Sequence, residues 1–334
     1  MRMKKTNRLY RCLLPLVWLT FLLSSCIKED YAGSTDETAT VNLVFSTRAD
    51  GQGTAEVDEN EGIKTLRVLI TDADGKVEIN TVQNFNDVSR TTLTILGVPV
   101  GTKNFYVIAN EASVGLTDLD DVSTVDEDFL NRVITNPSDA PYFPKTRSQI
   151  STSGLPITGM KEGVQVKGEG NQQIEIEIVH AVAKVVLNME NRMEETFRVN
   201  GVALGKFFAD ATNLFPERGS YPIGDAGLHT HYFKATTQGF EVPPGKHDAV
   251  FVFYLYETGE TALTEDFTIG LSSPTVPEIA AVKPFFTDGR NYLERNEQLV
   301  INAVVDVYKE VTVTSLNYEV QPWSSVSVEV PPFN

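Results

Sequence analysis

Along most of this chain, apolar and polar residues alternate, which is the pattern of β-strands that bury one face. The first such strand places Val41, Leu43 and Phe45 on a single side and ends at Arg48. Similar strands follow to the end of the chain, and prolines and glycines separate them. These further strands are predicted at 65–71, 76–79, 91–96, 104–109, 174–190, 199–204, 231–235, 249–256, 267–271 and 299–313.

Two local patterns predict the connections between strands. The sequence Asp72-Ala73-Asp74-Gly75 separates two apolar runs and is typical of a tight hairpin turn. Residues 118–133 are the best candidate for a helix, because apolar side chains recur there near helical spacing. A further helical turn is expected near Leu214, and 135–155 is expected to be a long loop rich in proline, serine and threonine.

The longest strand signal, at 174–190, changes phase in its middle. Apolar residues occupy even positions up to Ile178 and odd positions from Val179 onward. A slip of one residue turns the buried face over. We interpret it as a β-bulge or as the point where the chain leaves one domain for the next. The chain is therefore predicted to be mostly β, with an N-terminal sandwich at 49–178, a C-terminal sandwich at 179–334 and one or two short helices.

The first 25 residues have the layout of a bacterial secretion signal. A basic start without acidic residues precedes an apolar run at 12–23, which is too short to span a bilayer as a helix. Leu23-Ser24-Ser25-Cys26 resembles the lipobox of bacterial lipoproteins, so we expect cleavage before Cys26 and lipid on its thiol. The alternative is an ordinary signal peptide with a chance cysteine. Residues 27–30 (IKED) resemble the export tag that sends lipoproteins of Bacteroidetes to the outside of the outer membrane.

Charge and composition exclude several classes of function. Removal of residues 1–25 moves the formal net charge from −17 to −22, which gives no electrostatic footprint for nucleic acid. Four histidines, no cysteine after Cys26 and a single tryptophan after the signal, Trp323, leave little material for catalysis. Asp72-x-Asp74 fits a hairpin turn better than a calcium loop, and His229-x-His231 lacks an evident third ligand. No enzyme, metal site or cofactor is predicted.

Several segments in this order resemble the fimbrillin family of Bacteroidetes, the FimA-like subunits of type V pili. They are the lipobox at Cys26, the strand ending at Arg48, 155–160 (LPITGM), 181–185 (AVAKV), Arg290-Asn291 and Gln321-Pro322-Trp323. The resemblance implies two tandem transthyretin-like β-sandwich domains. It associates no reaction with the protein and implies other fimbrial subunits as partners.

The family's assembly mechanism implies roles for both ends of the chain. Residues 26–48 become a lipid tether followed by a removable strand that carries Val41, Leu43 and Phe45. An arginine-specific protease cuts between Arg48 and Ala49. A donor strand within 318–334 of the next subunit then takes the vacated place. Its candidate residues are Val320, Trp323, Val326, Val328, Val330 and Phe333. The alternatives are a surface arginine at a strand end and an ordinary last strand.

The resemblance therefore predicts a structural subunit of an adhesive surface fimbria, delivered as an outer-membrane lipoprotein. Within the family, a fimbrial anchor or a tip accessory subunit remains the alternative. From a different class, a surface glycan-binding lipoprotein also remains, although a single tryptophan after the signal offers few aromatic platforms for sugar rings.

Overall fold

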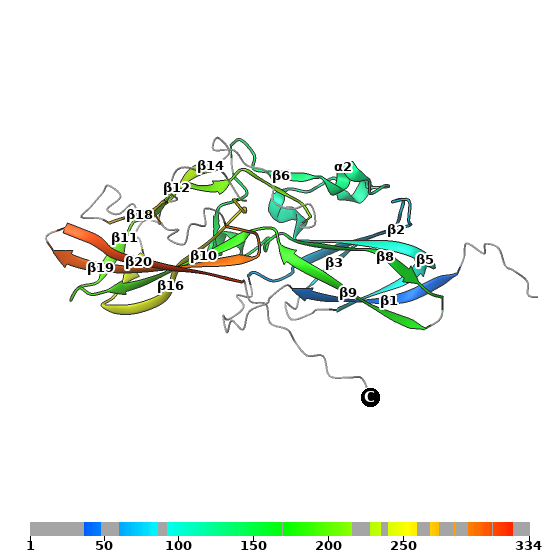
Figure 1. The fold of residues 1–334 in the computed structure, drawn as a ribbon, viewed down its shortest axis with the longest axis horizontal. Helices are drawn as coiled ribbons and strands as arrows, with labels where there is room; N and C mark the ends of the chain where they lie inside the picture. Colours follow the sequence, from blue (N-terminus) through cyan, green and yellow to red (C-terminus); the bar gives the residue numbers. More distant parts are fainter. Residues whose placement is uncertain are drawn as a thin grey trace, which may run out of the picture. The chain divides into compact units, whose positions relative to one another are not determined.

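The computed structural model describes residues 37–47, 60–85, 92–139, 141–168, 170–215, 228–234, 240–258, 268–273, 283–284, 293–308 and 310–322. Strands dominate this part of the chain (Figure 1). The predicted fold class, a mostly β protein built of sandwiches, is confirmed. Within the described residues, no helix is long and apolar enough to cross a membrane.

Seven strands of the first half form one sheet in the order β3-β2-β5-β8-β9-β1-β4. Strands β8 and β9 pair only where Ile157 and Thr158 meet His180 and Val179. Inward side chains of β1, β4 and β9 share one core with those of β2, β5 and β8, so the sheet closes into a sandwich. The bounds are β1 Thr38–Thr47, β2 Thr65–Thr71, β3 Val77–Asn84, β4 Thr92–Pro99, β5 Gly101–Ala109, β8 Ile157–Val166 and β9 Asn171–His180.

The single helix predicted at 118–133 is wrong. The segment contains a 3-10 turn, η2 (Leu119–Asp121), and one helical turn, α2 (Glu127–Leu130), with extended backbone between them. The cause is the β2–β3 hairpin: the Val77 amide donates to the Ser123 carbonyl oxygen at 2.9 Å, and the Val125 amide donates to that of Gly75 at 2.7 Å. These bonds hold 123–125 as a short edge beside the turn, where a helix cannot form. A separate 3-10 turn, η1 (Glu111–Val114), follows β5.

The second half is built from a five-stranded sheet, β20-β19-β10-β16-β7, and a four-stranded sheet, β14-β12-β17-β18. With the strand pair β11–β15, they enclose a second apolar core. The bounds are β7 Lys145–Thr146, β10 Ala183–Asn191, β11 Phe197–Val199, β12 Gly201–Ala209, β14 Leu228–Lys234, β15 Phe240–Val242, β16 Gly245–Leu255, β17 Thr268–Ser272, β18 Lys283–Pro284, β19 Glu297–Tyr308 and β20 Glu310–Pro322.

The phase slip at 174–190 marks a change of sheet. Strand β9 ends at His180 in the first sheet, and β10 begins at Ala183 in the five-stranded sheet. The slip thus coincides with a change of sheet, and our interpretation of it as a domain boundary stays a prediction. Strand β10 is buried on both faces, because Val185 and Leu187 face the second core while Val186 faces a third apolar cluster.

The single strand predicted at 299–313 is wrong, because the chain reverses between Tyr308 and Glu310. Tyr308 pairs with Glu310, and β19 and β20 then pair antiparallel along their whole lengths. Apolar residues alternate on both sides of the reversal, and no glycine, proline or asparagine marks the turn. The alternation of apolar and polar residues therefore continues through the turn, so the sequence gives no sign of the turn.

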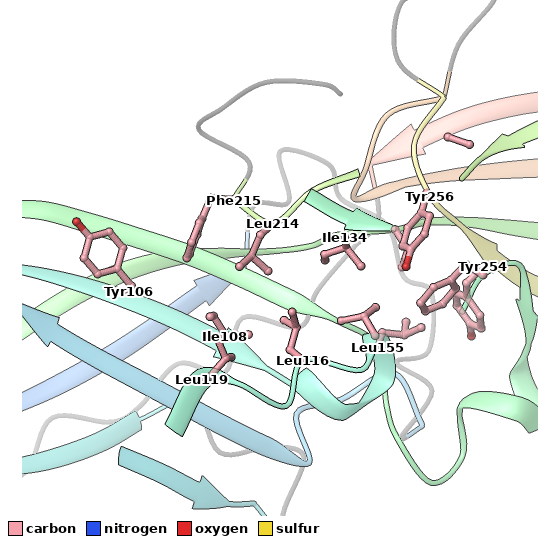
Figure 2. Packing of buried hydrophobic residues seen from close by; sticks show 14 of the residues in the cluster. Tyr106, Ile108, Leu116, Leu119, Ile134, Leu155, Leu214, Phe215, Tyr254 and Tyr256 are labelled. Atoms are coloured by element: carbon pink, nitrogen blue, oxygen red, sulfur yellow. The ribbon is translucent and has the colours of Figure 1, made fainter. Parts of the chain in front are cut away.

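Part of the first half pairs with the second. Strand β6 (Val133–Thr135) pairs with β13 (Ala211–Asn213), and β7 pairs with β16. The predicted loop at 135–155 thus contains β7 and the 3-10 helix η3 (Arg147–Ile150), and the helical turn expected near Leu214 is replaced by β13. A third apolar cluster connects the halves: Figure 2 shows Tyr106 and Ile108 together with Leu214, Phe215 and Tyr254. The boundary at 178/179 stays a prediction.

Candidate functional site

The first described strand, β1, lies inside its sheet, between β9 and β4. Figure 1 shows it beside β9. It pairs in parallel with β9 from Thr40 to Thr47 and antiparallel with β4 from Thr38 to Val44. Within the described residues, β4 pairs with no strand other than β1. Removal of β1 would therefore open the edge of β9 and leave β4 without its ladder partner.

The inward face of β1 is fully packed. Val41 and Leu43 are 0% exposed, and Ala39 and Phe45 are each 5% exposed. All four belong to the core of the first sandwich, together with Ile174 and Ile176 of β9 and Leu93 and Ile95 of β4. The three residues predicted to line the removable strand therefore do lie together on its buried face. Whether the strand is removed remains a prediction.

The backbone of β1 is paired on both sides from Val41 to Val44, and its pairing with β9 continues from Phe45 to Thr47.

A buried acid just before β2, which sequence reasoning missed, holds this part of the chain. Glu61 is 4% exposed, and its Oε1 lies 2.7 Å from Lys184 Nζ of β10. The Tyr254 hydroxyl of β16 donates to the same oxygen at 2.5 Å. A glutamate in a polar, glycine-rich segment carries no signal in the sequence that would distinguish it from a solvated one.

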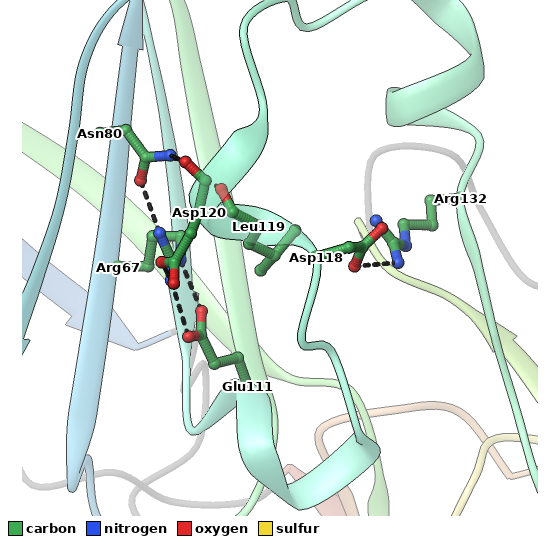
Figure 3. A network of polar contacts seen from close by, with 7 residues as sticks. All are labelled: Arg67, Asn80, Glu111, Asp118, Leu119, Asp120 and Arg132. Atoms are coloured by element: carbon green, nitrogen blue, oxygen red, sulfur yellow. Dashed lines mark hydrogen bonds and ion pairs between the residues drawn. The ribbon is translucent and has the colours of Figure 1, made fainter.

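A second polar network, centred on the buried Arg67, holds the segment after β5 against the first sheet (Figure 3). The guanidinium of Arg67, on β2, donates to both carboxylate oxygens of Glu111, at 2.6 and 2.9 Å, and to Asp120 at 2.7 Å. Asn80, on β3, accepts a further bond from Arg67 at 2.6 Å and donates to the Leu119 carbonyl oxygen at 2.8 Å. The hydrogen bond to Glu111, helped by Asp120, raises the pKa of Arg67 against the opposing effect of burial.

The remaining predicted site residues divide into two groups. Val320 lies in β20, where its backbone pairs with Leu299, so the first residues of the candidate donor segment form the edge of the five-stranded sheet. The others lie outside the described residues: Cys26, Arg48, Ala49, Trp323, Val326, Val328, Val330 and Phe333. The described part of the chain contains no cluster of three side chains able to hold a metal ion.

Comparison with known proteins gives a family match over much of the first half. Residues 39–177 match the family model described as "Major fimbrial subunit protein (FimA)". No curated protein sequence matches the chain.

Solved structures share the fold along most of the chain. A fimbrilin (fimA) from Porphyromonas gingivalis W83 superimposes with a TM-score of 0.55 at 11% identity, covering 88% of this chain and 100% of that one. The tip fimbrial protein Mfa3 from Porphyromonas gingivalis, with a C-terminal truncation, gives 0.54 at 14% identity over 85% and 100% of the two chains. A fimbrial assembly protein from Parabacteroides distasonis ATCC 8503 gives 0.51 at 14% identity over 85% and 95%.

Proposed function

The chain carries a domain of the FimA family of major fimbrial subunit proteins over residues 39–177, and on this premise we propose that it assembles into a cell-surface fimbria by exchange of β1. The proposal includes its route to the surface. Residues 1–25 act as a signal peptide, and lipid on Cys26 anchors the precursor in the outer membrane. An arginine-specific protease then cuts between Arg48 and Ala49. The role is structural and adhesive rather than catalytic.

The position of β1 is the observation that carries this proposal. It is the first strand of the described residues and is paired on both sides, so one cut behind it detaches it without cutting any other described strand. Each fully buried side chain contributes roughly 1.5–3 kcal/mol of hydrophobic free energy, so detachment leaves an apolar channel that favours a replacement. The open backbone of β9 would bind that replacement by strand addition.

The replacement strand in this proposal is the C-terminal segment of another subunit. Residues 318–322 belong to β20, so we place the exchanging strand within 323–334 of the predicted donor segment. Val326, Val328 and Val330 alternate with polar residues there, as a strand with one buried face requires.

Proteolysis of the purified precursor, from Ile27 onward, tests the proposal. After treatment with an arginine-specific protease, N-terminal sequencing should detect Ala49, and any SDS-resistant ladder should form only from the cleaved chain. The matched control is Arg48→Lys, which keeps the charge and removes the cleavage site. A ladder that forms equally in this variant, or a wild-type chain that stays uncut at Arg48, would overturn the proposal.

A further inference from the structure

The channel occupied by β1 widens along its length. The side chains that fill it increase in size from Ala39 through Val41 and Leu43 to Phe45, and each is at most 5% exposed. Because protein interiors are packed to crystal-like density, a strand that replaces β1 must supply similar volumes in the same order. The side-chain sizes of β1 therefore predict the side-chain sizes of the strand that replaces it.

The aromatic end of the channel imposes the strictest requirement. Phe45 has the largest side chain on the buried face of β1, and it is only 5% exposed. A replacement strand must fill the same volume with its own side chain at this position, because an unfilled gap in the core forfeits packing contacts.

The chain's own C-terminal segment does not meet this requirement. Aligned in the direction of β1, Val326 takes the place of Val41, and Val328 and Val330 take the places of Leu43 and Phe45. Both substitutions leave unfilled volume in a dry core, which costs stability. Registers that bring Trp323 or Phe333 to the Phe45 position place Glu319 or Glu329 in the Val41 pocket, where an unpaired carboxylate is strongly disfavoured.

A segment just before the predicted donor segment does have side chains that increase in size in the required order, but it already forms part of a sheet. Leu316 and Tyr318 have suitable volumes, but they lie in β20, where their backbones pair with Ala303 and Ile301 of β19. Their release would dismantle the edge of the second sandwich.

We infer that this channel is matched to the donor strand of a different subunit, one with a leucine-sized side chain followed two residues later by an aromatic ring. The inference rests on the proposed strand exchange and names its partner. It makes the protein a co-assembling subunit, with little tendency to polymerise with itself.

The first experiment measures, in the intact chain, how well valine side chains fill the positions of Leu43 and Phe45. Leu43→Val/Phe45→Val gives β1 the pattern of the C-terminal segment, and we expect the melting temperature to fall by roughly 5 °C or more. The control is Val44→Ala, on the outer face of the same strand, with a shift of about 1 °C. If the double variant has the same melting temperature as the wild type, the inference is overturned, regardless of the result of the assembly experiment.

Assembly is then measured with the donor side altered. Val328→Leu/Val330→Phe gives the C-terminal segment the required pattern, and after cleavage behind Arg48 we expect at least about tenfold more SDS-resistant ladder than from the wild type. The control, Ser327→Leu/Glu329→Phe, adds the same side chains to the opposite face and should give no increase. A wild-type chain that polymerises as well as the variant, or a cleaved variant without a gain, overturns the inference. Absence of cleavage at Arg48 overturns the proposed function instead, and the melting comparison then decides the inference alone.

Discussion

At the scale of single residues, buried charges join parts of the chain that lie far apart in sequence. Lys184 and Glu61 are 5% and 4% exposed at their side chains, and their contact connects the segment before β2 to the five-stranded sheet. A buried pair of this kind adds little net stability over apolar residues, but the loss of one partner is costly. Its effect is to fix which segments meet.

We therefore expect Lys184→Met to lower the free energy of unfolding by about 3–5 kcal/mol, because the Glu61 carboxylate stays buried without its ion-pair partner. Glu61→Gln/Lys184→Met should recover most of this loss, since the amide oxygen still accepts from the Tyr254 hydroxyl. Urea denaturation of both variants measures the difference. If the double variant is less stable than Lys184→Met alone, the ion pair is not the cause.

His180 should make stability depend on pH. Burial lowers the pKa of its imidazole below the ordinary value of 6.5, against the hydrogen bond with Asn296, the charge of Glu61 and a backbone contact with that residue, while the charge of Lys184 lowers it further. The unfolded chain thus takes up a proton near pH 6.5 while the folded chain stays neutral. The stabilising contribution is complete above this pH and is lost as the pH falls toward the folded pKa.

Between pH 6.5 and the folded pKa, the slope from this residue approaches about 1.4 kcal/mol per pH unit. Urea midpoints at several pH values should show it in the wild type, and His180→Gln should have a flatter profile. The control is His247→Gln, because that ring lies at the surface against the Pro243 carbonyl oxygen. Equal slopes in all three proteins would contradict the prediction.

At the scale of elements, turns decide what neighbouring segments become. The Asp72 carboxylate accepts from the amides of Asp74 and Lys76, at 3.0 and 2.9 Å, and closes the β2–β3 hairpin. Gly75 then adopts a φ of +85°. Its carbonyl oxygen accepts from Val125, which keeps 123–125 extended against the helical spacing of their sequence.

We expect Gly75→Ala to cost more than the strain of a positive φ. A Cβ atom at this position would lie 2.4 Å from the Val125 carbonyl oxygen, so the turn and the segment beside it must separate. The control is Gly163→Ala, with a φ of +69° and no atom within 4 Å of the added carbon. Gly163→Ala should lower stability by about 1 kcal/mol through strain alone, and Gly75→Ala by about 2 kcal/mol or more. Equal losses, measured by urea denaturation, would show that the close approach has no effect.

At the scale of the whole described chain, the two sandwiches share a core. The third apolar cluster combines residues of β5, such as Tyr106, with Phe215, Val252 and Tyr254 from the second half (Figure 2). Pairing of β6 with β13 and of β7 with β16 crosses the same junction. Such continuity predicts that the halves unfold together.

Calorimetry tests this cooperativity. The wild type should show one transition, and Phe215→Ala, at a site that is 0% exposed, should lower its stability by about 3–5 kcal/mol without dividing it. The control is Leu96→Ala, whose side chain is 72% exposed and should change little. Two separate transitions in the wild type would mean that the shared core does not couple the sandwiches.

The sequence alone was enough to predict the class of fold, the buried face of β1 and a change of strand face near residue 180, where the structure changes sheet. These properties follow from side-chain period, because a strand that buries one face must alternate and a change of face must slip the phase. The resemblance of short segments gave the family, which the match over 39–177 supports.

Contacts between distant segments settled the structure of 118–133, the reversal between Tyr308 and Glu310, and the polar partners of Glu61 and Arg67. In each case the deciding interaction joins segments that are distant in sequence or lies where periodicity continues unbroken. Arg67 and Glu111, for example, meet across 44 positions, and no local pattern carries their distance or their burial. Local spacing predicts what a segment prefers, and long-range hydrogen bonds and packing then select the structure that the whole chain can satisfy.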